Sequence, residues 1–235
     1  MRASLFYGSR GRRFRDEETV YAGDGIPRAV TRLEEIARQL AASKAVIGEP
    51  PRSAKGAVAV ILRGRAAVEA LVIERSEREG DPWSGQLAFP GGRRSRGDRT
   101  LLDTVRRETK EEVGLSLSRN ARLLGWLPAR APGNRVEWVV VPFVFALTRA
   151  ARLAPGPEVA RALWVPLDEM PSSLHRAVIE LPGGDLEVPA FLVGGMPLWG
   201  FSFRVLCDLF DLVGWPGETA RRKPEPKARR ITRSR

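Results

Sequence analysis

The chain has 235 residues, 43% of them hydrophobic and 29% charged, which is typical of a globular domain with a sizeable core. Its formal net charge is +11, yet residues 1–15 carry +5 and residues 217–235 carry +6, so the span between them is neutral. A single cysteine, Cys207, excludes an internal disulfide and a thiolate metal cluster, and a single histidine argues against a multi-histidine metal site.

The basic charge belongs to the two ends of the sequence. Such ends can attract nucleic acid or another anionic surface, but solvated tails that aid solubility are the favoured interpretation. No apolar run reaches the roughly 18 residues that span a bilayer, so no membrane contact is expected. The cysteine usage fits a reducing compartment, and we expect a cytoplasmic protein.

The first predicted elements are a helix and a hairpin. Apolar residues recur at helical spacing over residues 28–42 and predict an amphipathic helix packed on the domain. Residues 48–55 are rich in turn formers and predict a linker. The apolar runs 56–62 and 67–73 flank a short basic turn, which favours a β-hairpin.

The second half of the chain alternates strands and helices. Residues 122–127 and 138–147 predict strands, the second apolar enough to be buried on both faces. A short helix is expected near 167–170, a hairpin over 179–191, and a final helix over 197–213. Helices before, among and after mixed strands indicate an α+β fold.

Three segments follow from this pattern. Residues 1–54 are expected to hold a basic start, the first helix and a linker, and residues 55–216 the main domain. Residues 217–235 are expected to form a basic disordered tail. No feature of the sequence predicts an oligomeric state.

The most informative stretch runs from Phe89 to Leu115. It opens with Pro90-Gly91-Gly92, which predicts a turn, and continues from Thr100 with helix formers that end at Gly114. On that helix Glu108, Glu111 and Glu112 stand at i, i+3 and i+4, so their carboxylates share one face.

Three like charges on one helical face repel one another, which a bound cation would relieve. Oxygen-only ligands favour Mg²⁺ or Mn²⁺ over zinc, so the pattern predicts a metal site. A solvated face, with Arg106, Arg107 and Lys110 as ion-pair partners, is the alternative and would be the favoured one for the charged run alone.

The glycines on either side favour the metal site, because the whole stretch resembles the Nudix box. In that resemblance Gly92 takes the first position, Arg107-Glu108 the central pair, Glu111-Glu112 the second pair, and Gly114-Leu115 the end. Three departures are present. Asp98 replaces the first glutamate, eight residues rather than seven precede Arg107, and Thr109 fills an aliphatic position.

The resemblance implies a Nudix-type α/β/α sandwich with a mixed sheet and a hydrolase that needs Mg²⁺ or Mn²⁺. It assigns the metal to Glu108, Glu111, Glu112 and the backbone of Gly92, with Glu111 or Glu108 as the proton acceptor. Arg107 is expected either to hold the carboxylates in place through hydrogen bonds or to contact a phosphate.

Residues upstream of the box are similar to the coenzyme A pyrophosphatase branch of this family. Leu71 to Ser76 and Gly85 to Gly92 match the branch signature in register, whereas Gly80 stands where a second arginine belongs. Arg78 could substitute for it. The extra residue before Arg107 also occurs in this branch.

Several residues outside the box are candidates for the site, each against an ordinary structural role. Arg75, Arg78 and Arg135 are candidate phosphate contacts. Glu158 is an additional ligand or base, or a loop charge. Asp98 is expected to fix its loop, and Trp83 and Trp199 either stack on a base or, as favoured, pack in the core.

The implied activity is cleavage of coenzyme A or a derivative at its pyrophosphate bond, to 3′,5′-ADP and 4′-phosphopantetheine. One alternative is a Nudix pyrophosphatase for another nucleoside diphosphate derivative, such as NADH or ADP-ribose, which the glycine at position 80 favours. The other is a non-catalytic Nudix-fold module that binds nucleic acid through its basic tails.

Overall fold

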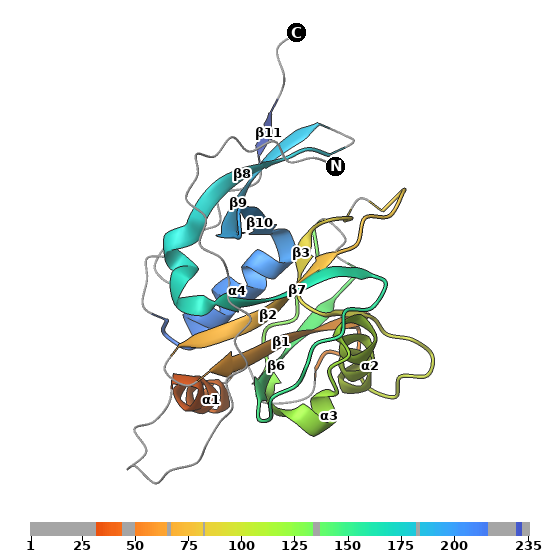
Figure 1. Ribbon diagram of the computed structural model, residues 1–235, viewed down its shortest axis with the longest axis vertical. Helices are drawn as coiled ribbons and strands as arrows, with labels where there is room; N and C mark the ends of the chain where they lie inside the picture. The colour runs from red at the N-terminus through yellow and green to blue at the C-terminus, as the bar shows by residue number, and fades with distance from the viewer. Residues whose placement is uncertain are drawn as a thin grey trace.

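The computed structural model describes residues 32–43, 50–64, 67–81, 83–133, 137–181, 184–215 and 229–231 (Figure 1). Its main sheet has seven strands, β1 (Gly56–Gly64), β2 (Val68–Arg75), β3 (Leu87–Ala88), β4 (Gly91–Arg93), β5 (Ala121–Trp126), β6 (Val140–Leu147) and β7 (Val159–Pro166). The helices of the described residues are α1 (Arg32–Ala42), α2 (Leu101–Val113), α3 (Leu117–Asn120) and α4 (Gly200–Leu212), with 3₁₀ turns η2 (Leu167–Glu169) and η3 (Pro171–Ser173).

The main sheet is mixed, as predicted. Its strands run in the order β3-β2-β1-β6-β5, with β4 also paired to β1 and β7 to β2. Strand β1 is parallel to β6 and antiparallel to β2. The predicted hairpin over 56–73 is therefore confirmed, and so are the strands predicted over 122–127 and 138–147.

The β1–β2 hairpin is paired near its turn and is opened at its far end by the glycine segment. Leu62 to Gly64 pair with Val68 to Ala70. Farther along, β1 pairs with β4 and β2 pairs with β3. Strands β3 and β4 and the short link between them thus enter the sheet beside both strands of the hairpin, which places the glycines next to the central strand.

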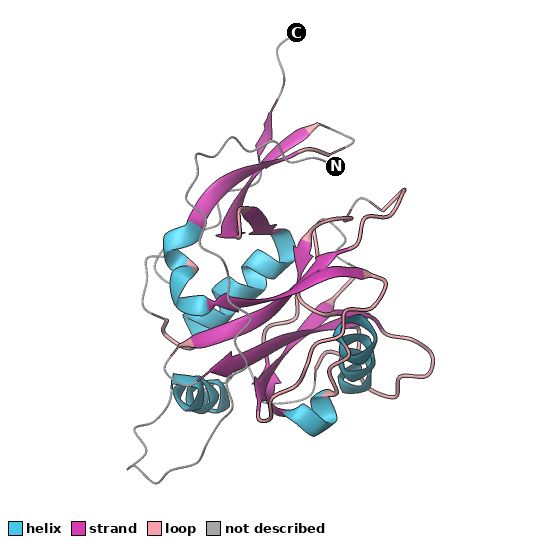
Figure 2. Ribbon diagram, viewed as in Figure 1, coloured by secondary structure: helices cyan, strands magenta, loops and turns pink. Residues whose placement is uncertain are grey.

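Helices cover both faces of the sheet (Figure 2). Along β1, Val60 and Leu62 belong to the apolar core that includes α1 and α4. Ala59 and Ile61 belong to the core on the opposite face, which includes α2. Because successive side chains of a strand point to opposite faces, one strand supplies both cores, and the architecture is the predicted α/β/α sandwich.

Helix α1 is part of this sandwich. Its Ile36 and Leu40 are buried in the core shared with α4, as the predicted amphipathic helix requires. The first four residues of the predicted range, 28–31, lie outside the described residues. The helix therefore packs on the same core as the strands, although it precedes the expected linker.

A second sheet contains β8 (Leu174–Ile179), β9 (Asp185–Val193), β10 (Met196–Trp199) and β11 (Arg229–Ile231), with β9 paired to the other three. The predicted hairpin over 179–191 is confirmed in type but begins earlier. Prediction of a helix from residue 197 was wrong, because residues 197–199 complete β10 and α4 begins at Gly200. Strand β11 lies within the expected disordered tail and pairs with β9.

Among the described residues, none of the helices is both long and apolar enough to cross a membrane.

Candidate active site

Helix α2 begins and ends as its sequence predicts. The Thr100 side chain accepts a hydrogen bond from the backbone N–H of Asp103, and the Asp103 carboxylate accepts one from Thr100 in return, which makes a capping box. Gly114 ends the helix in the left-handed conformation at φ 70°, where a side chain would be strained. These caps fix the register of the three glutamates.

Two glycines bring the sheet close to α2. Gly91 pairs with Val58, and Gly92 with Ala57, in the short β4–β1 ladder, so the predicted turn at 91–92 is a strand. A Cβ atom on Gly91 would lie 2.3 Å from the carbonyl oxygen of Ala57, and one on Gly92 would lie 2.6 Å from the carboxyl carbon of Glu108. Only glycine leaves room for this carboxylate against the strand.

Glu112 is the most deeply buried of the three box glutamates, at 5% exposure. Its Oε2 accepts a hydrogen bond from the backbone N–H of Gly91 at 2.7 Å. Burial is the main reason that the pKa of Glu112 is raised to about 8; the nearby charges of Glu108 and Glu158 contribute to the rise, while the Gly91 bond and Arg75 oppose it. A cation at this carboxylate would offset that cost.

Glu108 lies beside Glu112 on the same side of the helix and is half-buried. Burial raises the pKa of Glu108, against the opposing effect of the Arg107 guanidinium. The Arg107 Nη2 lies 2.8 Å from Glu108 Oε1. Two desolvated carboxylates therefore face the glycine segment, and one of them is held by a guanidinium.

Arg107 connects the glutamates to the loop before the helix. Its Nη1 lies 2.9 Å from Glu111 Oε2, and its Nη2 donates to the carbonyl oxygen of Arg93. The guanidinium also donates two bonds to Asp98, which is buried and accepts a further bond from the backbone N–H of Ser95. This is the positioning role expected for Arg107 and the loop-fixing role expected for Asp98.

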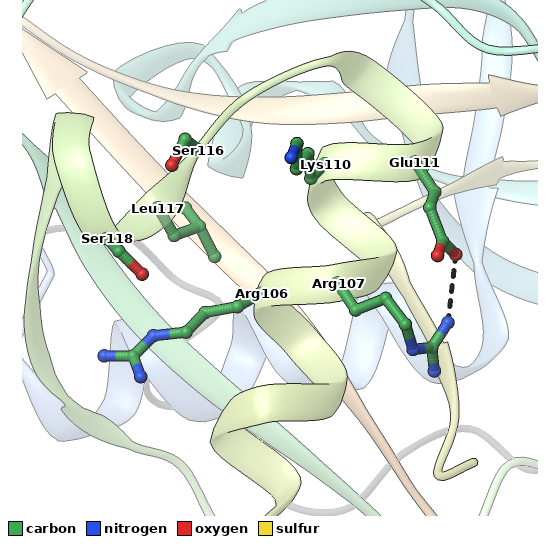
Figure 3. A pocket seen from close by; sticks show the side chains of 7 residues that line it. All are labelled: Arg106, Arg107, Lys110, Glu111, Ser116, Leu117 and Ser118. Atoms are coloured by element: carbon green, nitrogen blue, oxygen red, sulfur yellow. Dashed lines mark hydrogen bonds and ion pairs between the residues drawn. The ribbon is translucent and has the colours of Figure 1, made fainter. Parts of the chain in front are cut away.

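Glu111 is placed differently from its two neighbours. Its side chain is 58% exposed and bends toward Arg107 (Figure 3). In the described part of the chain, no group of three or more histidine, cysteine, aspartate or glutamate side chains is arranged to hold a metal ion. The structure thus brings Glu108, Glu112 and Gly92 together and leaves Glu111 at the rim.

The wall of the site opposite α2 contains two of the predicted arginines, Arg75 and Arg78. Each of them forms an ion pair with an acidic side chain. Arg75 Nη2 lies 2.8 Å from Asp81 Oδ2, and Arg78 Nη2 lies 3.1 Å from Glu158 Oε1. Asp81 lies in the loop between β2 and β3 and was not among the predicted site residues, so its role was missed. The third predicted arginine, Arg135, lies outside the described residues.

Backbone contacts fix this wall to the helix. The N–H of Ser76 donates to the carbonyl oxygen of Glu158 at 2.9 Å, and the N–H of Gly156 donates to the carbonyl oxygen of Glu112 at 2.8 Å. Because Arg75 and Glu158 both act on the pKa of Glu112, the wall lies within electrostatic reach of the glutamates.

An aromatic pair lies on the Asp81 side of the site. Trp83 is 46% exposed, and its ring centroid is 6.4 Å from that of Trp199 on β10. Asp81 accepts a hydrogen bond from the backbone N–H of Trp83 while it binds Arg75. The favoured prediction, that Trp83 packs in the core, is therefore wrong.

A protein-family model described as "NUDIX domain" matches residues 53–182. Among curated proteins, an "Uncharacterized Nudix hydrolase NudL" of Photorhabdus laumondii is 31% identical over 134 residues, or 55% of this chain and 70% of that protein. NudL of Pectobacterium atrosepticum is 36% identical over 101 residues, or 42% of this chain and 50% of that protein.

An uncharacterized protein of Schizosaccharomyces pombe is 39% identical over 108 residues, or 43% of this chain and 32% of that protein. The chain therefore matches half or less of the Pectobacterium and Schizosaccharomyces relatives. Among solved structures, a MutT/nudix family protein from Enterococcus faecalis is 18% identical with a TM-score of 0.46, over 80% of this chain and 76% of that one.

Proposed function

Because the chain belongs to the Nudix family, we propose that it is a pyrophosphohydrolase that cleaves a nucleoside diphosphate linked to another group. The observation that carries the proposal is the arrangement of Glu112 and Glu108, two desolvated carboxylates turned toward a glycine segment that a side chain would fill. Such a site costs free energy unless a cation occupies it.

The donors present fit Mg²⁺ or Mn²⁺. Carboxylate oxygens of Glu108 and Glu112, with the Gly92 carbonyl, are hard oxygen ligands, and Glu111 would join them on release from Arg107. No cysteine or histidine lies among these candidates, which argues against a zinc site. When bound, the ion supplies positive charge for the diphosphate and lowers the pKa of the attacking water.

The remaining chemistry falls to side chains of the chain. We assign proton acceptance from the water to Glu111, which lies at the rim of the site, or to Glu108, which lies beside Glu112. Arg107 positions them by binding each through a separate nitrogen. Gly91 orients Glu112 through its N–H.

The phosphates are assigned to the opposite wall. Arg75 is partly exposed, and its Nη2 would exchange Asp81 for a phosphate oxygen. Arg78 is half-exposed and would exchange its surface ion pair with Glu158 for a phosphate at little cost. The base is assigned to the exposed face of Trp83.

Coenzyme A or a derivative is the proposed substrate, on the sequence similarity to the coenzyme A branch. Hydrolysis of NADH or ADP-ribose is the second candidate, favoured by Gly80. That residue is exposed at φ 79° and has nothing within 4 Å of an added Cβ, so position 80 supplies no phosphate contact of its own.

The test is cleavage by the purified full chain with Mg²⁺ or Mn²⁺ of coenzyme A, NADH, ADP-ribose and a nucleoside triphosphate. Glu111→Gln is the control. We expect coenzyme A to be cleaved fastest and the variant to lose about 10²–10⁴-fold in rate. Preference for another substrate would discard coenzyme A and keep the hydrolase, whereas no cleavage of any would overturn the proposed activity.

A further inference from the structure

A hollow lies on the outer side of α2, between it and α3. It is lined by Arg106, Arg107, Lys110, Glu111, Ser116, Leu117 and Ser118 (Figure 3). Three of these side chains are cationic and one is anionic, so the lining carries a net charge of +2. Neither Ser116 nor Ser118 has an assigned role in the site described above.

The cations of the hollow are not equivalent. Arg107 and Glu111 neutralise each other at 2.9 Å and extend to one side of α2, whereas Arg106 extends toward Ser118 on the other (Figure 3). Within the described ranges, neither Arg106 nor Lys110 has an ion-pair partner. Two cations one helical turn apart, without a counter-charge, repel each other.

One donor in the hollow is desolvated and unused. The Nε of Arg106 is buried and finds no hydrogen-bond partner among the described residues. The terminal nitrogens of the same guanidinium extend away from α2 on the side of Ser118 (Figure 3), so they, rather than the buried Nε, are the donors that Arg106 offers to a ligand. The hydroxyl of Ser116, which precedes α3 without capping it, and that of Ser118 add further donors.

We propose that this hollow is a binding site for a phosphate monoester, held by Arg106 and Lys110 with the serine hydroxyls. A dianion matches the net charge of +2, and its several acceptor oxygens match the number of donors. Carboxylates offer fewer acceptors and less charge. The site is distinct from the glutamate cluster, although Arg107 and Glu111 belong to the lining of both.

The phosphate has two possible sources, a terminal phosphate of the substrate or a free phosphate. The first rests on the proposed function, since coenzyme A carries a 3′-phosphate in addition to its diphosphate. The second does not depend on it.

Binding measurements with nucleotides that the protein does not cleave distinguish a substrate phosphate from a free phosphate. Affinities of the full chain for 3′,5′-ADP, 5′-AMP and inorganic phosphate would be measured by calorimetry, for wild type, Arg106→Gln, Lys110→Gln and Arg119→Gln. Arg119 is exposed on α3 outside the hollow and serves as the matched control. Thermal unfolding of each variant confirms that it folds.

We expect 3′,5′-ADP to bind wild type and Arg119→Gln about tenfold or more tightly than 5′-AMP, and both hollow variants to lose that preference. Inorganic phosphate that binds wild type but not the hollow variants, with no preference between the nucleotides, would support a free-phosphate site. Equal binding of every probe to all four proteins would overturn the proposal. Failure of coenzyme A cleavage alone would not, because no binding arm requires turnover.

Discussion

The carboxylate of Asp98 accepts two hydrogen bonds from Arg107, from Nε at 3.1 Å and from Nη2 at 2.9 Å. The same guanidinium contacts Glu108 and Glu111. The loop that contains Asp98 is therefore connected through one side chain to both glutamates proposed to act on the water.

Replacement of Asp98 tests this connection through stability. The Arg107 hydrogen bonds lower the pKa of Asp98 below its ordinary value of 3.8, so the unfolded chain binds more protons in acid than the folded protein does. The contribution of Asp98 is present above about pH 4 and is lost as the pH falls through the lowered pKa. Asp98→Asn should destabilise the protein by about 1–3 kcal/mol at pH 7.

Denaturant unfolding of both proteins from pH 7 down to pH 2.5 is the measurement. The difference in free energy of unfolding should shrink as the pH falls below about 4. A difference that stays constant over that range would contradict the ion pair.

Glu112 should matter more for metal binding than for folding. Glu112→Gln replaces a carboxyl group that is largely protonated near pH 7 in the metal-free protein and keeps an oxygen for the Gly91 N–H, so the metal-free protein should keep its stability within about 1 kcal/mol. Mn²⁺ should raise the melting temperature of wild type, because it binds the folded state, and the variant should lose that rise. An unchanged Mn²⁺ response would remove Glu112 from the proposed ligands.

Gly156 holds the Glu158 loop against the end of α2. A Cβ atom there would lie 2.3 Å from the backbone carbonyl oxygen of Glu111, which cannot move away as a flexible side chain could. Gly156→Ala should therefore cost about 1–3 kcal/mol by overpacking. Gly97→Ala, whose nearest atom is Ser95 Oγ at 3.8 Å, is the matched control and should change the melting temperature little.

Substitution of Trp83 should weaken substrate binding without slowing the chemical step. Trp83→Ala should raise KM for the cleaved nucleotide about tenfold, since loss of base stacking costs about 1–3 kcal/mol, and should leave kcat within about twofold. Leu123→Ala removes another exposed apolar side chain, on β5, and should change neither constant. A fall in kcat with an unchanged KM would exclude the stacking role.

The sequence was informative where a local rule decides the structure. Both ends of α2 follow from Thr100 and Gly114, and the i, i+3, i+4 spacing correctly placed Glu108 and Glu112 on one side. Spacing could not show that Glu111 bends away, because that depends on Arg107. Nor could it show that Arg75 is bound by Asp81, since the pair forms only when the loop folds back.

Strand β10 was missed for a different reason. Pro197 begins a mostly apolar run that continues into α4, with Ser202 as its first polar residue, so the run resembled one long helix. Gly194 and Gly195, both at positive φ, mark the hairpin turn before it. A proline is tolerated there because, among the described strands, β10 pairs with β9 alone and lies at the edge of its sheet.

The parallel pairing of β1 with β6 sets an order for folding of the main sheet. Gly56 pairs with Val140, far along the chain, whereas the β1–β2 hairpin closes over a few residues. During synthesis the hairpin can form early, but the other edge of β1 stays without β6 until residues 140–147 have emerged. A nascent chain arrested before that point should expose an apolar strand edge and aggregate.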